Sequence, residues 1–312
     1  MRKIDALPGL APRERDGHKG DYGRVLVVGG SHGMAGAPCL CGEAALRSGA
    51  GLVTIAVPVG LYPIVAARVA ASCMTHPLPD LSAEVPRCGT KAERPGGGLS
   101  DSGIDEVIEY AGRFDVIALG PGIGRAPETV RLVHALVSKV ERPMVVDADG
   151  LNALSGNAGV LRAARAKRIL TPHPGEMARL AALKSAEEVQ QNRLGIASEF
   201  ALKFGVVVAL KGYHTVVTDG ERYYENNTGN PGMATGGTGD VLTGLVAALV
   251  AQGLEAFEAA QLGVYLHGLA GDLGAERLGE ISLIASDLLD ELPRAFQQRQ
   301  AHRRGAEDAE NG

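Results

Sequence analysis

The chain has 312 residues with 31 basic and 36 acidic side chains, so its formal net charge at neutral pH is −5. This mildly acidic composition, without a basic block, argues against nucleic-acid binding. No apolar run reaches the roughly 18 residues of a membrane span. The first twenty residues are polar and interrupted by Pro and Gly, unlike a secretory signal. Four cysteines without zinc spacing predict buried free thiols in a reducing cytoplasm: Cys39, Cys41, Cys73 and Cys88.

Short β-branched runs alternate with helix-like segments through the first two thirds of the chain. Strands are predicted at 24–30, 51–57, 114–119, 144–147, 168–171 and 206–210, and helices at 36–48, 128–140 and 186–204. Nearly apolar strands separated by helices predict an α/β fold with a central, mostly parallel sheet and helices on both faces. Right-handed crossovers then bring the carboxyl ends of the strands to one edge, where ligands bind.

The pattern changes after residue 211. An Asp-Gly pair within 215–225 predicts a β-hairpin, and helices are predicted at 240–252, 256–278 and 285–296. We find no repeat and no linker, so we expect a single domain over residues 1–296. The polar tail 297–312 is expected to be disordered. The breaker-rich stretch 86–103 is interpreted as a surface loop, either a lid or a tolerated insertion.

The strongest functional signal is the segment 230–244, NPGMATGGTGDVLTG. A glycine-rich loop that enters a helix presents unpaired N–H groups and the positive end of the helix dipole to an anion, most commonly phosphate. Asp240 lies at the start of this helix. It either caps the helix or acts as a general base beside bound phosphates.

Other segments at predicted strand ends leave two interpretations open. Residues 33–37 and 120–124 are nearly free of side chains, so a ligand lies against bare backbone there or a strand packs tightly against a helix. His173 is held between two prolines, and Lys211 ends a strand where its charge can meet a phosphate or face solvent. Asp147 and Asp149 could hold Mg²⁺ through water, although we expect solvated acids.

In this order the motifs resemble the ADP-dependent NAD(P)H-hydrate dehydratase family of the ribokinase-like superfamily. The similar segments are 18–58, 119–125 (LGPGIGR), 145–154 (VVDADGLNAL), 170–180 (LTPHPGEMARL), 210–220 (LKGYHTVVTDG) and the 230–244 loop. The resemblance covers about residues 18–295. It implies a ribokinase-like fold and a nicotinamide-cofactor repair enzyme. Such an enzyme dehydrates the S-epimer of NADHX or NADPHX, coupled to hydrolysis of ADP, or of ATP, with Mg²⁺.

The resemblance also implies roles for individual residues. Asp240 would be the catalytic base and a substrate contact. Further substrate contacts would be Ala37, one of Gly122 and Gly124, and His173. The adenine nucleotide would contact Lys211, Gly212, Tyr213, His214, Thr215, Gly236, Gly237, Thr238 and Gly239. Related vitamin kinases carry an Asn at the position of His173, so direct metal binding there is not expected, and the metal ligands stay open. A cytoplasmic homo-oligomer, paired functionally with a separate NAD(P)HX epimerase, completes the expectation.

Three alternatives use the same residues. A ribokinase-like kinase of a vitamin precursor would share the anion-binding loop and Asp240. A serine hydrolase would use Ser31, within a G-x-S-x-G pattern between a strand and a helix, but the chain is too short before it for the upstream strands of that fold. A nucleotide sensor would bind without turnover, and it would not need an acid at position 240.

Overall fold

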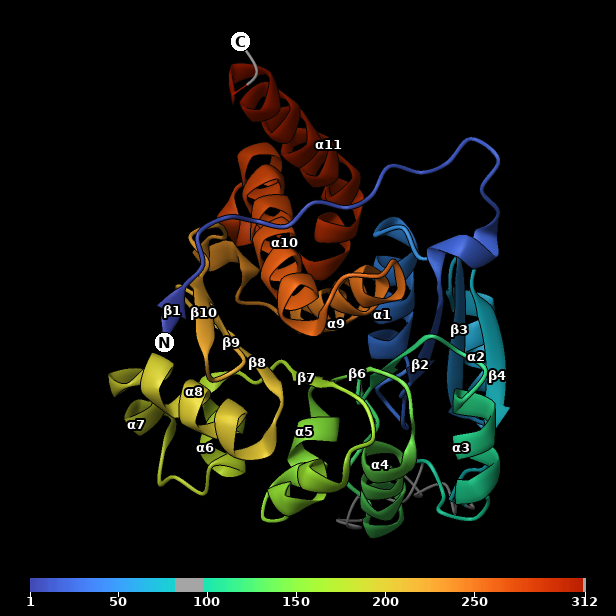
Figure 1. Ribbon diagram of the computed structural model, residues 1–312. Coiled ribbons are helices and arrows are strands. Elements are labelled where there is room, and N and C mark those ends of the chain that lie inside the picture. Colours follow the sequence, from blue (N-terminus) through green and yellow to red (C-terminus); the bar gives the residue numbers. More distant parts are fainter. Residues whose placement is uncertain (82–97, 311–312) are drawn as a thin grey trace.

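The computed structural model describes residues 1–81 and 98–310. Ten strands form one sheet in the order β1-β10-β9-β8-β7-β6-β5-β2-β3-β4 (Figure 1). The ladders of this sheet are parallel except the two that flank β9. The predicted α/β fold with a mostly parallel sheet is therefore confirmed.

The strands are β1 (Arg2–Lys3), β2 (Arg24–Val28), β3 (Leu52–Pro58), β4 (Met74–Leu78), β5 (Val116–Leu119), β6 (Met144–Val146), β7 (Arg168–Leu170), β8 (Val207–Leu210), β9 (Val216–Thr218) and β10 (Arg222–Glu225). All six predicted strands before residue 211 are present, and so is the hairpin of β9 and β10. The sequence did not predict β4, because this edge strand is only partly buried and contains both His and Pro. Two-residue β1 is too short for any periodic signal.

The helices are α1 (Gly36–Arg47), α2 (Tyr62–Arg68), α3 (Ile104–Ala111), α4 (Pro127–Lys139), α5 (Asp149–Leu154), α6 (Pro174–Leu180), α7 (Ala186–Gln191), α8 (Arg193–Phe204), α9 (Thr238–Ala251), α10 (Ala256–Leu278) and α11 (Ala285–Glu310). Short 3₁₀ turns are η1 (Lys19–Tyr22), η2 (Ala158–Ala163), η3 (Pro231–Met233) and η4 (Glu280–Ser282). The helix predicted at 186–204 is divided at Asn192, whose side chain accepts a hydrogen bond from the Gly195 amide and caps α8.

The end of the chain differs from the expected disordered tail. Helix α11 continues past residue 296 as far as Glu310. Residues 297–310 are rich in Ala, Gln, Arg and Glu, which favour helix, and they extend a helix whose first part is already packed. The extent of a single domain over residues 1–296 stays a prediction.

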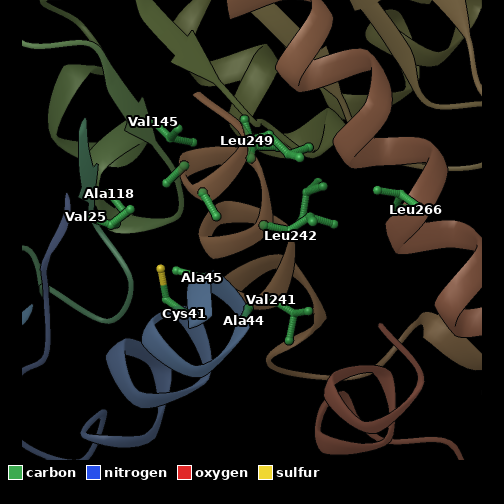
Figure 2. Close-up of a cluster of buried hydrophobic side chains, with 14 of the residues drawn as sticks. Val25, Cys41, Ala44, Ala45, Ala118, Val145, Val241, Leu242, Leu249 and Leu266 are labelled. Carbon is green, nitrogen blue, oxygen red and sulfur yellow. The ribbon is translucent and has the colours of Figure 1, made fainter. Parts of the chain in front are cut away.

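Strand alternation divides the core into two layers. On β2, Val25 and Val27 belong to the layer of α1, α9, α10 and α11, whereas Leu26 and Val28 belong to the layer on the opposite face, where α3 to α8 pack (Figure 1). Figure 2 shows part of the first layer, in which Cys41 and Ala45 of α1, Leu242 of α9 and Leu266 of α10 lie in one cluster with strand residues such as Ala118. This layer fixes α9 against the sheet, and α9 carries Asp240 at its first turn.

The crossing of α1 and α9 allows no side chain at Gly244. A Cβ atom there would overlap the carbonyl oxygen of Cys41 and lie 3.0 Å from the Cβ of Ala44. We expect Gly244→Ala to lower the free energy of unfolding by about 3 kcal/mol, because a rigid backbone cannot yield. Urea unfolding checks this, with Gly159→Ala as the matched control, since nothing lies within 4 Å of a Cβ at position 159. Equal stabilities of the two variants would contradict the expectation.

Several smaller expectations concern the cysteines and the breaker-rich stretch. Cys39 and Cys41 are buried free thiols as predicted, and Cys73 is free but only partly buried, while Cys88 lies outside the described residues. Most of the stretch 86–103, interpreted as a possible lid, also lies outside them. Within residues 1–81 and 98–310, no helix is long and apolar enough to cross a membrane.

Candidate functional site

One edge of the sheet gathers the carboxyl ends of β2, β5, β6, β7 and β8. Helix α9 begins at the same edge. This edge includes the point between β5 and β2 where the strand order reverses, a position at which α/β proteins commonly bind ligands. The chemistry-bearing segments of the sequence therefore converge here, as parallel topology requires.

Hydrogen bonds fix the conformation of the loop before α9. Gly237 has a φ of 96°, in the left-handed region. The hydroxyl of Thr238 lies 3.1 Å from the carbonyl oxygens of Met233 and Thr235. Nε2 of His267 on α10 donates to the Thr238 carbonyl at 2.8 Å, and burial lowers the pKa of His267 to about 4, so its ring is neutral. These bonds leave the first amides of α9 directed at the site.

A buried ion pair lies directly beside this loop. Nζ of Lys211 is 2.6 Å from Oδ1 of Asp147, and the Thr243 hydroxyl on α9 lies 2.8 Å from Oδ2. Nζ also lies 4.0 Å from Oε2 of Glu176. A Cβ at Gly239 would be 3.2 Å from this Nζ and 3.4 Å from Oδ2 of Asp147, so a larger residue would press on the ion pair. The cluster joins β6, β8, α6 and α9 at one point.

Asp240 and Glu176 are the carboxyl groups with unusual proton affinity. Burial, followed by the negative charge of Asp147, raises the pKa of Asp240 to about 7, although the Lys211 ammonium opposes the shift. Burial likewise raises the pKa of Glu176 to about 7. The pKa of Lys211 is raised, because Asp147 and Glu176 outweigh the opposing effect of burial. A carboxyl with a pKa near neutrality is suited to take and release a proton.

His173 caps α6 through its backbone amide and through Nδ1 of its ring. Nδ1 accepts from the amides of Gly175 and Glu176 at 3.1 and 3.3 Å, and Oε2 of Glu176 accepts from the His173 amide at 2.9 Å. Since Nδ1 is an acceptor, the proton of the neutral ring is on Nε2. Burial and the charge of Lys211 lower the pKa of His173. His173 is therefore structural and half exposed to the site at once.

The two loops of the predicted glycine-lined wall pack tightly against each other, and their contact with a ligand stays a prediction. A Cβ at Gly122 would lie 3.2 Å from the Cβ of Ala37, and Gly122 has a φ of 61°. A Cβ at Gly124 would lie 3.3 Å from Ser31. The Ser31 hydroxyl is 6% exposed and donates to the Gly122 carbonyl at 2.8 Å. The loops after β2 and β5 thus form one surface, and Ser31 serves this packing rather than the nucleophile role considered above.

The β8–β9 turn brings only part of the predicted nucleotide segment to the cluster. Lys211 faces inward, and Arg193 on α8 donates to the carbonyl oxygens of Leu210 and Lys211 at 2.8 and 3.3 Å. Tyr213 is 89% exposed. Nδ1 of His214 lies 2.9 Å from Oε1 of Glu225.

The remaining turn residues have local partners within or beside the turn. The hydroxyl of Thr215 donates to the carbonyl oxygen of Gly212 at 2.9 Å, which closes the turn. His214 borders a separate hollow on the β1 side of the sheet. The nucleotide roles of Gly212, Tyr213, His214 and Thr215 stay predictions.

The candidate metal ligands differ from expectation in one respect. Asp147 is 1% exposed and bound by Lys211 and Thr243, so it is not the solvated acid that the sequence suggested. Asp147 is buried because it directly follows the apolar strand β6. Asp149 is occupied by Arg125 and Asn152. Within residues 1–81 and 98–310, no group of three or more His, Cys, Asp or Glu side chains could hold a metal ion.

Sequence reasoning missed Thr243 and His267 as parts of the site, and it noted Glu176 only as the acid of the His173-x-x-Glu176 element, without giving it a role. Thr243 lies one helical turn after Gly239, so its spacing from the loop was a usable signal. Glu176 stands three residues after His173, the spacing of a capping box. His267 has no local signal, because only the packing of α10 against α9 brings it to Thr238.

The sheet order, the loop before α9 and the acid at its first turn define the class as ribokinase-like. A ribokinase-like superfamily protein from Enterococcus faecalis superposes with a TM-score of 0.75 at 25% identity, covering 93% of this chain and 92% of that chain. An ADP/ATP-dependent NAD(P)H-hydrate dehydratase from Bacillus subtilis, co-crystallised with ATP and Mg²⁺, gives 0.74 at 28% identity, covering 93% and 94%.

The chain belongs to the NAD(P)H-hydrate dehydratase family, which it matches over residues 25–294. The bifunctional NAD(P)H-hydrate repair enzyme Nnr of Moorella thermoacetica is 49% identical over 91% of this chain and 51% of that enzyme. The corresponding Escherichia coli enzyme is 38% identical over 91% of this chain and 50% of that enzyme. The chain therefore spans about half the length of these relatives. The predicted family and fold are confirmed.

Proposed function

We propose that this chain dehydrates the S-epimer of NADHX or NADPHX to the reduced cofactor, coupled to hydrolysis of ADP to AMP and phosphate, with ATP as an alternative donor. The observation that carries the proposal is the position of Asp240. Asp240 lies in the first turn of α9, directly after residues Gly236–Gly239 in the chain, and its carboxyl group has a pKa of about 7. Family membership supplies the substrate class.

The proposed chemistry follows from this geometry. Asp240 accepts the proton of the ring hydroxyl while that oxygen attacks the terminal phosphorus of the nucleotide, and the phosphoanhydride bond breaks so that AMP leaves when the donor is ADP. The backbone amides of Gly236–Gly239, here called the cradle, stabilise the charge on the transferred phosphoryl group. Phosphate then leaves as the ring nitrogen donates its electron pair to form a C=N bond. Loss of a proton from the neighbouring ring carbon restores the dihydropyridine.

Magnesium fits the donor set in a supporting role. Bound Mg²⁺ neutralises phosphate charge and prefers a few carboxylates together with phosphate oxygens and water. Since residues 1–81 and 98–310 hold no cluster of three such side chains, phosphate oxygens and water would supply most of its ligands, and Glu176 would supply one carboxylate, because Asp147 is paired with Lys211 and Thr243. The homo-oligomeric state, cytoplasmic location and pairing with a separate epimerase are part of the same proposal.

The direct test mixes the protein with hydrated cofactor and either ADP, ATP or no nucleotide, and follows the absorbance of the reduced nicotinamide. We expect an absorbance gain only with nucleotide, with one free phosphate for each cofactor restored. A stable phosphorylated product would instead indicate a small-molecule kinase. Nucleotide binding without any turnover would indicate a sensor.

The pH dependence of turnover tests the assigned base. Asp240 must be ionised to accept a proton, so turnover should rise with pH through about 7 and fall about tenfold per pH unit below it. Glu176→Gln removes a negative charge that raises the pKa of Asp240, so the midpoint of its pH–rate profile should move to lower pH. A midpoint near pH 4 in the wild-type protein would contradict the assignment.

A further inference from the structure

Two arginines border the site but have no role in the chemistry above. Arg125 ends the glycine-rich loop after β5, and Arg179 lies in the last turn of α6, the helix that His173 caps. Both are exposed, and the Arg125 side chain is 66% exposed. They come from different strand–helix connections, so their proximity is a product of the fold.

Helix α5 holds both arginines through one face. Nε of Arg125 donates to Oδ1 of Asp149 at 2.7 Å, and Nε of Arg179 donates to Oδ1 of Asn152 at 3.0 Å. The Asn152 amide in turn donates to Oδ1 of Asp149 at 3.1 Å. Asp149 and Asn152 are three residues apart, where Cβ atoms on a helix are about 5–6 Å apart. The two guanidinium groups are thus linked to each other through the side chains of Asp149 and Asn152.

The anchoring leaves the ends of both guanidinium groups free. Each arginine uses Nε, and in residues 1–81 and 98–310 the terminal nitrogens have no acceptor. Asp149 is the carboxylate that is hydrogen-bonded to this pair, and the positive charge of Arg179 also opposes the rise that burial causes in the pKa of Glu176. A planar guanidinium whose Nε is fixed presents its remaining donors in a geometry that suits phosphate oxygens. The arrangement is therefore complementary to an anion.

The arginines lie next to the predicted substrate contacts. Oδ2 of Asp149 accepts from the Gly124 amide at 3.3 Å, which ties Arg125 to the glycine-lined wall. Nη1 of Arg179 lies 3.7 Å from a Cβ at Gly175, beside His173. A hydrated nicotinamide ring at Asp240 places its own phosphates one ribose away. They need a positive partner outside the cradle.

We propose that Arg125 and Arg179 bind a phosphate group of the hydrated dinucleotide substrate, with Asp149 and Asn152 as positioning residues. The proposal rests on the proposed function, because it assumes that substrate. It differs from the cradle, which takes the phosphates of the adenine nucleotide. The free guanidinium ends form charge-assisted hydrogen bonds with phosphate in the ground state and the transition state alike, so they contribute to binding rather than to the chemical step.

The test uses Arg125→Gln, Arg179→Gln and the double variant. Each single change should raise KM for hydrated NADPH about tenfold with little change in kcat, and the double variant should raise it further. KM for ADP should stay within about twofold. Arg113→Gln is the matched control: it removes an equally exposed arginine, 65% exposed and paired with Glu109, at the opposite edge of the sheet.

A second readout does not depend on turnover. Calorimetric titration of NADPH, the expected product, should give a Kd about tenfold weaker for each single variant than for the wild-type protein or the Arg113 control. Equal NADPH affinities, or no NADPH binding by the wild-type protein, would overturn the proposal. A change confined to ADP affinity would also overturn it. Failure of the dehydration assay alone, with the NADPH result intact, would reject only the proposed reaction.

Discussion

Asp240→Asn should lower turnover by about 10²–10⁴-fold while nucleotide affinity stays near that of the wild-type protein. The amide keeps the size of the side chain at the first turn of α9 but cannot accept the hydroxyl proton. Single-turnover kinetics with hydrated cofactor measure the first effect, and calorimetric titration of ADP measures the second. Asp290→Asn, which removes an exposed carboxylate on α11, is the control. Near-normal turnover of Asp240→Asn would reject the general-base role.

The same variant should be more stable than the wild-type protein at pH 8. The pKa of Asp240 is about 7 in the folded protein and near 3.8 when unfolded. The folded state therefore binds the proton more tightly, and stability is lost as pH rises from about 4 to 7. An asparagine carries no such penalty, so the gain should be on the order of 4 kcal/mol at pH 8 and vanish near pH 4. Urea unfolding at both pH values checks the sign.

Lys211→Met should produce the second large effect, on stability and on the pH–rate profile together. Asp147 and Glu176 lose their cation, and breaking a buried ion pair from one side costs about 3–5 kcal/mol. The ammonium also opposes the rise in the pKa of Asp240. Its removal should move the midpoint of turnover to higher pH. Urea unfolding and a pH–rate profile measure the two results.

Two further variants separate the ion pair from other roles of Lys211. The double variant with Asp147→Asn should recover part of the lost stability, because the unpaired carboxylate is then also gone. Lys184→Met removes an exposed lysine before α7 and should have little effect. If nucleotide affinity also falls in Lys211→Met, the predicted phosphate contact of Lys211 gains support. Unchanged stability would contradict the importance of the pair.

Local sequence determined the parallel α/β architecture and most of its strands. Runs such as Val25–Val28 are apolar throughout, and a strand that is buried on both faces needs that pattern. The anion-binding character of the glycine-rich loop before Asp240 was also predicted, since the free amides and the helix dipole arise from residues adjacent in the chain. The edge strand β4 and the continuation of α11 were not predicted from the sequence, because neither has a strong hydrophobic periodicity.

The tertiary structure alone decided what each site residue touches. Sequence reasoning placed Lys211 and Asp147 at two strand ends, but only the sheet order brings Nζ within 2.6 Å of the carboxylate and buries the pair. The contact of the neutral His267 with Thr238, and the contacts of Arg125 and Arg179 with side chains of α5, depend on packing between distant segments. The sequence was thus sufficient to identify most of the chemical groups at this edge of the sheet. Their charge states depend on burial and distance, which exist only once the layers are packed.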